Sequence, residues 1–273
     1  MLIFPNCKIN IGLSVLRKRA DGFHDLETVF YPVSWNDLFE IVQTEPESPA
    51  LDYKSSGIRL YGPKEKNLCI RAHEIIAASN QIPPVKMHLH KIIPVGAGLG
   101  GGSADGAFTL LALNKICKLG LKDEELEKLA AQLGSDCPFF IRNKPVFASG
   151  RGNEMEEINL KLKGWYLVIV KPRLHIGTAE AFSGIVPKQP AVSLRTKISL
   201  PIQQWKNEIV NDFEQNIFEK HPSIRNIKNK LYQYGATYAS MSGSGSAVFG
   251  LFPEEKNLKP YFRSCTVWQG KLN

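Results

Sequence analysis

Five glycines fall within residues 96–102, between a stretch that alternates like a β-strand and a stretch with the apolar spacing of a helix. Glycine adopts positive φ angles at little cost and lets the backbone approach a ligand closely. A helix start adds unpaired N–H groups and the positive end of the helix dipole. The segment 94–104 therefore predicts a loop that binds phosphate at the beginning of a helix. A tight turn without a ligand would need fewer glycines.

Two common phosphate-binding loops do not fit this segment. A Walker A loop ends in Gly-Lys-Ser/Thr, but no lysine precedes Ser103. Gly96, Gly98 and Gly101 do match the spacing of a dinucleotide-binding loop. That fold also needs a second strand that ends in an acidic residue about 20 positions later, whereas residues 119–123 lead into another helix. The context thus favours neither a Walker A loop nor a Rossmann site.

The composition is that of an ordinary globular protein. Hydrophobic residues make up 43% and charged residues 22% of the 273 residues. The sequence contains no apolar run near the roughly 20 residues that cross a bilayer, and its first residues do not resemble a signal peptide. The five cysteines are scattered and include no C-x-x-C pair. We therefore expect reduced thiols, a cytoplasmic location and no membrane partner.

The net charge of +8 is compatible with nucleic acid, with anionic phosphate substrates and with general solubility. The basic residues are spread along the chain, and the longest basic run is residues 17–19. General solubility is the simplest explanation, so the charge alone assigns no function.

The order of strands and helices is mixed rather than a regular βαβ alternation, which predicts an α+β fold. We place a domain boundary near Ser149, which divides the chain into residues 1–148 and 149–273. Strands are expected over residues 6–15, 26–33, 37–43, 85–90, 165–170, 237–241 and 247–252. Helices are expected over residues 67–78, 178–185, 205–209 and 223–234, with one more that runs from Ser103 to Gly120 and another capped by Asp123.

The strand over residues 85–90 carries an H-x-H pair, His88 and His90. These histidines alternate with apolar residues, so we interpret them as the exposed face of a half-buried strand. Metal binding is the less favoured interpretation of the pair.

Three stretches resemble the superfamily of galactokinase, homoserine kinase, mevalonate kinase and phosphomevalonate kinase, the GHMP kinases. Residues 94–103 are similar to its ATP loop, residues 6–13 to its N-terminal motif, and residues 241–247 to its C-terminal glycine motif. The three occur in the expected order, and the resemblance covers nearly the whole chain. It implies a two-domain α+β fold, with an N-terminal domain of a type shared with a ribosomal protein and a C-terminal ferredoxin-like α/β-sandwich domain.

Finer features resemble one branch of this superfamily. They are residues 19–24, residues 65–68, the triple glycine before Ser103, and residues 134–138. The resemblance implies transfer of a phosphoryl group from ATP to the 2-hydroxyl of a cytidine-diphosphate-linked methylerythritol, a step of non-mevalonate isoprenoid biosynthesis. Cys7, Phe23 and Asp105 depart from the usual residues of that branch, but none removes a charge or donor that the chemistry needs.

The resemblance implies that Lys8 and Asp136 are the catalytic residues. Phosphoryl transfer mainly requires positioning and charge neutralisation. Asp136 would accept the proton of the acceptor hydroxyl or orient that hydroxyl, and Lys8 would offset charge on the moving phosphoryl group. A surface ion is the default role for most lysines and aspartates, but both residues have apolar flanks.

The resemblance also implies a nucleotide site, with Mg²⁺ bound alongside ATP as is usual in phosphoryl transfer. Asn67 resembles an adenine-contacting residue, and a plain helix N-cap is an equal alternative. Lys91 is expected either to reach the nucleotide or to be a solvated strand lysine. The expected nucleotide-binding residues are Asn67, Lys91, Pro94, Val95, Gly96, Ala97, Gly98, Leu99, Gly100, Gly101, Gly102, Ser103 and Ala104, and we assign no side chain as a dedicated metal ligand.

For the acceptor, the resemblance implies that Phe23 and Phe182 sandwich a cytosine ring, since aromatic faces stack well on bases. His24 and Asn10 would make polar contacts with the substrate. Thr178 would line the pocket. Gly243 and Gly245 are expected to form a close-approach turn beside the phosphates or the acceptor. Phe182 could alternatively be a helix core residue.

Three alternatives remain at this point. The chain could be another GHMP kinase of the mevalonate or homoserine type, a basic α+β module that binds RNA, or a kinase-derived sensor that binds nucleotide without turnover. Retention of Lys8 and Asp136 argues against the RNA-binding module. We expect a monomer or weak homodimer with small-molecule partners and no nucleic acid.

Overall fold

The computed structural model describes residues 1–272 and divides the chain into two compact units. The first unit comprises Met1–Cys7, Trp35–Val95 and Gly100–Lys144, and the second comprises Lys8–Ser34, Gly96–Leu99 and Pro145–Asn273. The predicted domain boundary near Ser149 stays a prediction.

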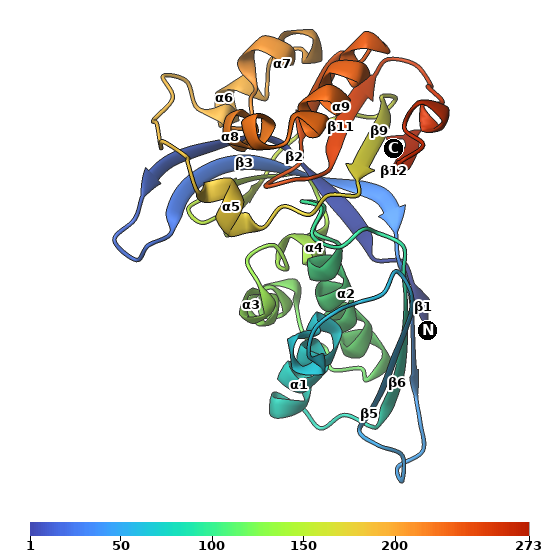
Figure 1. Ribbon diagram of the computed structural model, residues 1–273. Helices are drawn as coiled ribbons and strands as arrows, with labels where there is room; N and C mark the ends of the chain where they lie inside the picture. The colour runs from blue at the N-terminus through green and yellow to red at the C-terminus, as the bar shows by residue number, and fades with distance from the viewer. Residues whose placement is uncertain (273) are drawn as a thin grey trace. The chain divides into compact units, whose positions relative to one another are not determined.

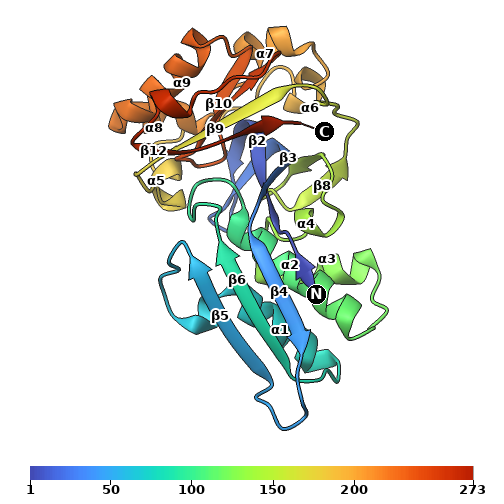
Figure 2. The same ribbon diagram turned by 90° about the vertical axis from the view of Figure 1, so that its right-hand side faces the viewer.

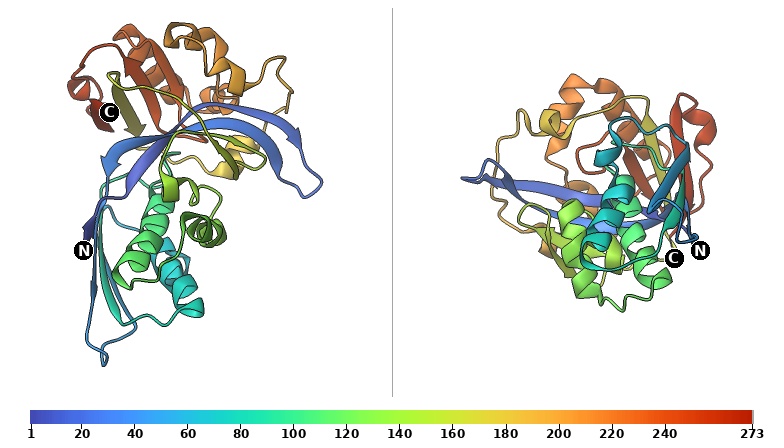
Figure 3. Two further views of the ribbon diagram at one scale, coloured as in Figure 1. Left: turned by 180° about the vertical axis from the view of Figure 1, so that it is seen from behind. Right: turned by 90° about the horizontal axis from the view of Figure 1, so that it is seen from below.

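The first unit packs helices against a sheet whose described strands follow the order β1-β4-β6-β5 (Figures 1 and 2). Its strands are β1 (Leu2–Ile3), β4 (Leu38–Gln43), β5 (Leu51–Gly57) and β6 (Val85–Lys91), and its helices are η1 (Lys64–Lys66), α1 (Leu68–Ser79), α2 (Gly101–Ile116), α3 (Asp123–Leu133) and α4 (Phe139–Arg142). The view from behind in Figure 3 shows α1 and α2 along one face of this sheet. Burial alternates along β6, with odd-numbered residues buried and even-numbered residues exposed. His88 and His90 therefore lie on the exposed face, as predicted.

Two helix starts in the first unit differ from the predictions. Helix α2 begins at Gly101 rather than Ser103, because Gly100 adopts the left-handed conformation with φ 69° and ends the loop there. Helix α3 is capped by Lys122 rather than Asp123, since the Glu125 carboxylate accepts a hydrogen bond from the Lys122 N–H at 2.9 Å. Strand β5 was not predicted, because its polar second half is exposed and carries no alternating signal.

In the second unit, the first sheet has the order β2-β3-β7-β8 among the described strands, and the long β2–β3 hairpin dominates it (Figure 1). The strands are β2 (Asn6–Lys18), β3 (His24–Asn36), β7 (Val146–Ser149) and β8 (Glu154–Glu157). Strand β2 begins in the first unit, at Asn6 and Cys7, and β3 ends there, at Trp35 and Asn36.

The other described sheet of the second unit is antiparallel, with the order β10-β11-β9-β12. Its strands are β9 (Tyr166–Pro172), β10 (Tyr238–Met241), β11 (Val248–Phe252) and β12 (Cys265–Lys271). Numbered from β9, this order is 2-3-1-4, the ferredoxin-like arrangement. The mixed architecture of the two units confirms the α+β prediction.

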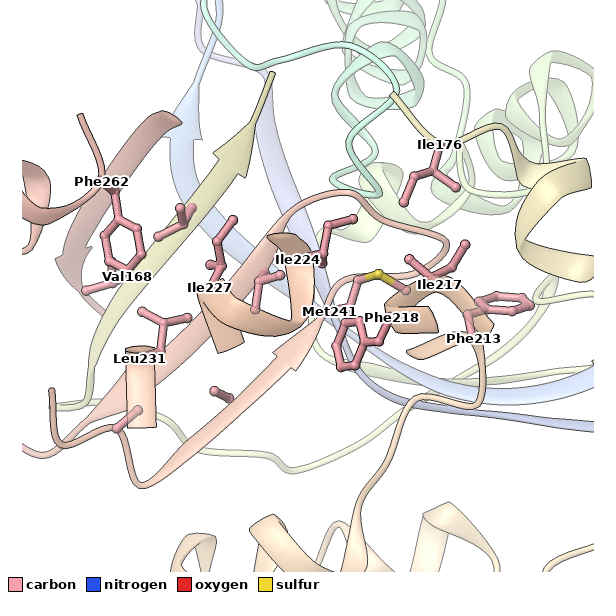
Figure 4. Packing of buried hydrophobic residues seen from close by; sticks show 14 of the residues in the cluster. Val168, Ile176, Phe213, Ile217, Phe218, Ile224, Ile227, Leu231, Met241 and Phe262 are labelled. Atoms are coloured by element: carbon pink, nitrogen blue, oxygen red, sulfur yellow. The ribbon is translucent and has the colours of Figure 1, made fainter. Parts of the chain in front are cut away.

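Helices on this sheet supply the core of the second unit (Figure 4). Helix α9 contributes Ile224, Ile227 and Leu231, spaced to lie on one helix face, and Met241 and Val168 meet them from the sheet. The helical segments are α5 (Thr178–Phe182), α6 (Leu194–Lys197), α7 (Ile202–Glu208), α8 (Phe213–Lys220), α9 (Pro222–Gln233) and η2 (Lys259–Tyr261). Throughout residues 1–272, each helix is too short or too polar to cross a membrane.

Candidate active site

The glycine loop leads from β6 into α2 through backbone conformations that favour glycine. Gly96, Gly98 and Gly100 have φ angles of 62°, 75° and 69°. A side chain at any of these positions would be strained, and at Gly98 its Cβ would overlap the carbonyl of Ser242. The loop therefore presents backbone groups rather than side chains at the start of α2, as a phosphate site requires.

A buried cluster of Asp37, Lys91 and Asp105, here called the charged trio, holds the ends of this loop within the first unit. The Lys91 ammonium group donates to Asp37 Oδ2 at 2.5 Å and to Asp105 Oδ2 at 2.6 Å. Asp37 Oδ1 accepts from the N–H groups of Ile92 at 2.5 Å and Ile93 at 2.8 Å. The trio thereby links the end of β6, where the loop begins, to helix α2, where it ends.

The trio carries one more negative than positive charge when all three groups are ionised. Burial raises the pKa of Asp105 to about 8, while Lys91 opposes the rise and Asp37 adds to it. The two aspartates outweigh burial at Lys91 and raise its pKa, so the ammonium stays charged. Asp105 is thus poised to hold a proton near neutral pH.

Lys91 is 2% exposed, so the alternative of a solvated strand lysine is wrong. The contribution of Lys91 to the nucleotide stays a prediction. Sequence reasoning missed Asp37, because it lies 54 positions from Lys91 and no local pattern joins them.

In the second unit, residues 96–99 lie against the second glycine motif. The Ser242 hydroxyl donates to the Gly98 carbonyl at 2.7 Å and accepts from the Asn10 N–H at 3.1 Å. The Ala247 N–H donates to the Ala97 carbonyl at 3.1 Å. A Cβ on Gly243, which has φ 55°, would lie 3.0 Å from Asn10 Oδ1, so this turn passes close to Asn10. Its approach to a ligand stays a prediction.

Lys8 and Asn10 lie side by side on β2, both 3% exposed. The Lys8 ammonium group donates to Asn10 Oδ1 and lies 4.6 Å from the centroid of the Phe30 ring. Asn10 Nδ2 donates to Thr28 Oγ1 at 3.0 Å. Burial of a lysine requires partners for its charge, so this lysine is not the surface ion of the default interpretation.

Asp136 lies in the first unit, in the turn between α3 and α4. The turn is held by buried residues on both sides, Leu133 before it and Cys137 and Phe139 after it. The Cys137 N–H donates to the Gly134 carbonyl at 3.1 Å, which closes the turn. Burial raises the pKa of the Cys137 thiol to about 12 and keeps it neutral, so Asp136 is the ionisable residue of this turn that phosphoryl transfer could use.

Asn67 is the N-cap of α1, as one of its two interpretations predicted. Its Oδ1 accepts from the Cys69 N–H at 2.9 Å, and its Nδ2 donates to the Tyr53 hydroxyl at 3.1 Å. A role of Asn67 toward adenine stays a prediction, as does that of Ser103, which lies in the first turn of α2.

The predicted acceptor residues lie in the second unit, where His24 and Phe182 stack on each other. Their ring centroids are 4.8 Å apart with an interplanar angle of 19°. Phe23 is 53% exposed and carries the Arg151 guanidinium over its ring, 4.2 Å from the centroid. Thr178 is exposed at the start of α5. The sandwich of a base by Phe23 and Phe182 stays a prediction.

Two segments of the chain match family models of the same kinase family. The model described as the N-terminal domain of GHMP kinases matches residues 67–144, and the model described as the C-terminal part of GHMP kinases matches residues 202–260.

Full-length relatives share close to half of their residues with this chain. A 4-diphosphocytidyl-2-C-methyl-D-erythritol kinase from Parabacteroides distasonis is 48% identical over 275 residues, and one from Bacteroides fragilis is 49% identical over 273 residues. Both alignments cover 100% of each chain.

Solved structures agree with these relatives. The crystal structure of a 4-(cytidine 5'-diphospho)-2C-methyl-D-erythritol kinase superposes with a TM-score of 0.83 at 30% identity, over 99% of this chain and 98% of that one. A homoserine kinase from Cytophaga hutchinsonii has a TM-score of 0.68 at 18% identity, over 98% and 95% of the two chains, which shows a shared fold alone. Since the family models and the full-length relatives agree, this chain belongs to the 4-diphosphocytidyl-2-C-methyl-D-erythritol kinase family of the GHMP kinases.

Proposed function

We propose that this protein transfers the γ-phosphoryl group of ATP to the 2-hydroxyl of 4-diphosphocytidyl-2-C-methyl-D-erythritol, giving the 2-phosphate and ADP in non-mevalonate isoprenoid biosynthesis. The structural observation that carries the proposal is the hydrogen-bond network from Lys8 through Asn10 and Ser242 to Gly98. It joins the N-terminal motif, the second glycine motif and the phosphate loop within one unit. The substrate is supported by the full-length relatives.

Lys8 and Asp136 perform the proton and charge handling in this proposal. Asp136 accepts the proton of the acceptor hydroxyl or orients that hydroxyl toward the phosphorus. Lys8 offsets the negative charge on the transferred group, and Asn10 holds its ammonium group in place. The burial of Lys8 excludes the water that would weaken this electrostatic effect.

ATP binds through the backbone of the glycine loop, whose N–H groups and helix start face the phosphates. In this proposal residues 94–104 contact the phosphates of ATP and Asn67 contacts its adenine. Lys91 acts on the loop through the charged trio. Among residues 1–272, His, Cys, Asp and Glu side chains form no cluster that could hold a metal ion by themselves. Mg²⁺ commonly binds with few protein ligands because substrate phosphates and water complete its shell. It would reach the site on the ATP phosphates and neutralise part of their charge.

The acceptor is held by Phe23 and Phe182 on the cytosine, with polar contacts from His24 and Asn10. Base stacking on an aromatic ring contributes about 1–3 kcal/mol. The Arg151 guanidinium covers part of Phe23 and the His24 ring covers part of Phe182. These are weak contacts of flexible or half-buried side chains, which a base can replace. Thr178 and Gly243 complete the proposed acceptor site.

A coupled assay of ADP release tests the proposal. The cytidyl substrate, mevalonate and homoserine are each offered with ATP and Mg²⁺, and we expect turnover with the cytidyl substrate alone. Turnover with mevalonate or homoserine instead would assign the protein to another GHMP activity. Size-exclusion chromatography in the same buffer tests the proposed monomeric or weakly dimeric state, and cell fractionation tests the cytoplasmic location.

A further inference from the structure

Asn211 precedes helix α8 and is 2% exposed. Its amide nitrogen donates to the carbonyl oxygens of Met241 and Gly243, both at 2.8 Å, and its Oδ1 accepts from the Phe213 N–H at 3.0 Å. Both donor hydrogens are therefore used on the two carbonyls that flank Ser242. A carboxylate or an aliphatic side chain of the same size could not make these bonds.

Glu214, in the first turn of α8, holds the same motif from a second side. Its Oε1 accepts from the Met241 N–H at 2.7 Å and from the Ser240 hydroxyl at 3.2 Å. Lys228 of α9 donates to its Oε2 at 2.5 Å, which compensates the buried charge. Asn211 thus bonds the carbonyl of Met241 and Glu214 bonds its N–H group. We name this pair of residues the α8 clamp.

The α8 clamp holds a turn that contacts the predicted active-site residues. Between Met241 and Gly243 lies Ser242, whose hydroxyl bridges the Asn10 N–H and the Gly98 carbonyl. The segment that carries Asn211 is tied to the strand that carries Lys8 and Asn10, because the Leu13 N–H donates to the Val210 carbonyl at 2.9 Å. A shift of the two clamped carbonyls would therefore move Ser242 relative to Asn10 and the phosphate loop.

We propose that Asn211 is a positioning residue for phosphoryl transfer, acting through Ser242 on Gly98 and Asn10. The inference rests on the proposed kinase function and deepens it, because it assigns a role to a residue outside the three kinase motifs. Asn211 touches neither substrate in this proposal. It determines how accurately the glycine motif is placed, and misplacement of about 1 Å can cost about 100-fold in rate.

The test compares Asn211→Asp and Asn211→Ala with the matched control Asn216→Ala. Asn216 lies within α8, and its side-chain amide donates a long hydrogen bond, 3.5 Å, to the Glu180 carbonyl. We expect kcat to fall about 10- to 100-fold in both Asn211 variants and to stay near the wild-type value in the control. A melting temperature far above the assay temperature verifies that each variant is folded during the assay.

The Asn211→Asp variant adds a pH readout that a purely structural role would not give. The new carboxylate faces two carbonyl oxygens, so its ionised form is disfavoured and its pKa rises. The neighbouring charged groups are Asp212, Glu214 and Lys228. Asp212 itself has a pKa raised by burial. When protonated, the carboxyl can again donate one hydrogen bond, so the kcat of N211D relative to wild type should rise about fivefold or more from pH 8 to pH 6.

The results distinguish a failure of the proposed kinase function from a failure of the proposed role of Asn211. If wild type does not turn over the cytidyl substrate, the proposed function fails. If wild type is active and the Asn211 variants keep its kcat and pH profile, with or without a lower melting temperature, the positioning role is refuted and Asn211 only stabilises the fold.

Discussion

Replacing Asp105 by Asn tests the charge balance of the trio at the two ends of the glycine loop. The substitution keeps the shape of the side chain and its acceptor for Lys91, while it removes the excess negative charge. Asp105 Oδ1 is buried without a hydrogen-bond partner. The new amide group has two N–H donors, one more than the protonated carboxyl of wild type, and a donor left unpaired in this buried place costs about 1–3 kcal/mol. We therefore expect D105N to be less stable than wild type in acid.

The contribution of Asp105 to the free energy of unfolding should change with pH in the opposite direction to that of a typical salt-bridged aspartate. Burial raises the pKa of Asp105 to about 8, whereas an unfolded aspartate titrates near 3.9. The native state therefore binds more protons than the unfolded state between these values. Wild type loses stability as pH rises through this window and levels off above it. The slope approaches about 1.4 kcal/mol per pH unit, or about 2–3 kcal/mol between pH 6 and pH 8.

The assay is urea unfolding at pH 6, 7 and 8, followed by circular dichroism, for wild type, D105N and the control Asp123→Asn. Asp123 is an exposed residue at the start of α3 in the same unit. The stability gap between wild type and D105N should shrink by about 2–3 kcal/mol from pH 6 to pH 8, and D123N should follow wild type. In thermal melts the same change corresponds to about 5–10 °C.

A constant gap between wild type and D105N across this pH range would refute the reasoning. It would mean that Asp105 stays ionised in the folded protein and that Lys91 neutralises both carboxylates. A gap that widens with pH would show that the Asp105 charge stabilises the fold, the reverse of the inferred burial cost.

Three further outcomes follow from the proposed site. Asp136→Asn should lower kcat at least about 100-fold while the dissociation constant of ATP, measured by calorimetry, stays within about threefold; equal turnover of mutant and wild type would contradict the catalytic role. Phe23→Ala should raise the KM of the cytidyl substrate about 10-fold, worth about 1.4 kcal/mol of stacking, with little change in kcat, and a fall in kcat alone would count against stacking. Asn67→Ala should cost about 1 kcal/mol of unfolding free energy through loss of the α1 cap, and an additional rise in the KM of ATP would support the adenine contact.

The sequence predicted the fold class and the strongly patterned elements, because alternation and helical spacing report burial directly. The same alternation indicates that Lys91 lies on the buried face of its strand, which the sequence analysis left open. Val85, Met87 and Leu89 are buried at odd-numbered positions of β6, and Lys91 continues that register into the core. A lysine on a buried face requires anionic partners, so its pairing was inferable, although the identity of Asp37 was not.

The predicted acceptor residues make contacts that could not be predicted from the sequence. Phe23 and Phe182 were grouped by resemblance, yet the side chain stacked on Phe182 is that of His24, one position along the chain. Neighbouring residues at a hairpin end point in different directions, and which one meets a distant helix depends on tertiary packing that no local pattern encodes. Arg151, which lies over Phe23, comes from another turn of the same unit and carried no sequence signal.

Glycines let the backbone approach a ligand but have no side chains that could hold the loop in place, so the geometry of a glycine motif depends on other residues. The charged trio does this for the start of the first loop through Asp37, which accepts from the two N–H groups after Lys91. Asn211 does it for the second motif through the carbonyls on either side of Ser242. In both cases a buried polar side chain hydrogen-bonds two backbone groups of the loop: Asp37 Oδ1 accepts from two N–H groups, and the Asn211 amide donates to two carbonyls. Because leaving such backbone groups unpaired costs about 1–3 kcal/mol each, replacing Asp37 or Asn211 by a residue without these hydrogen bonds should destabilise the loop that it holds.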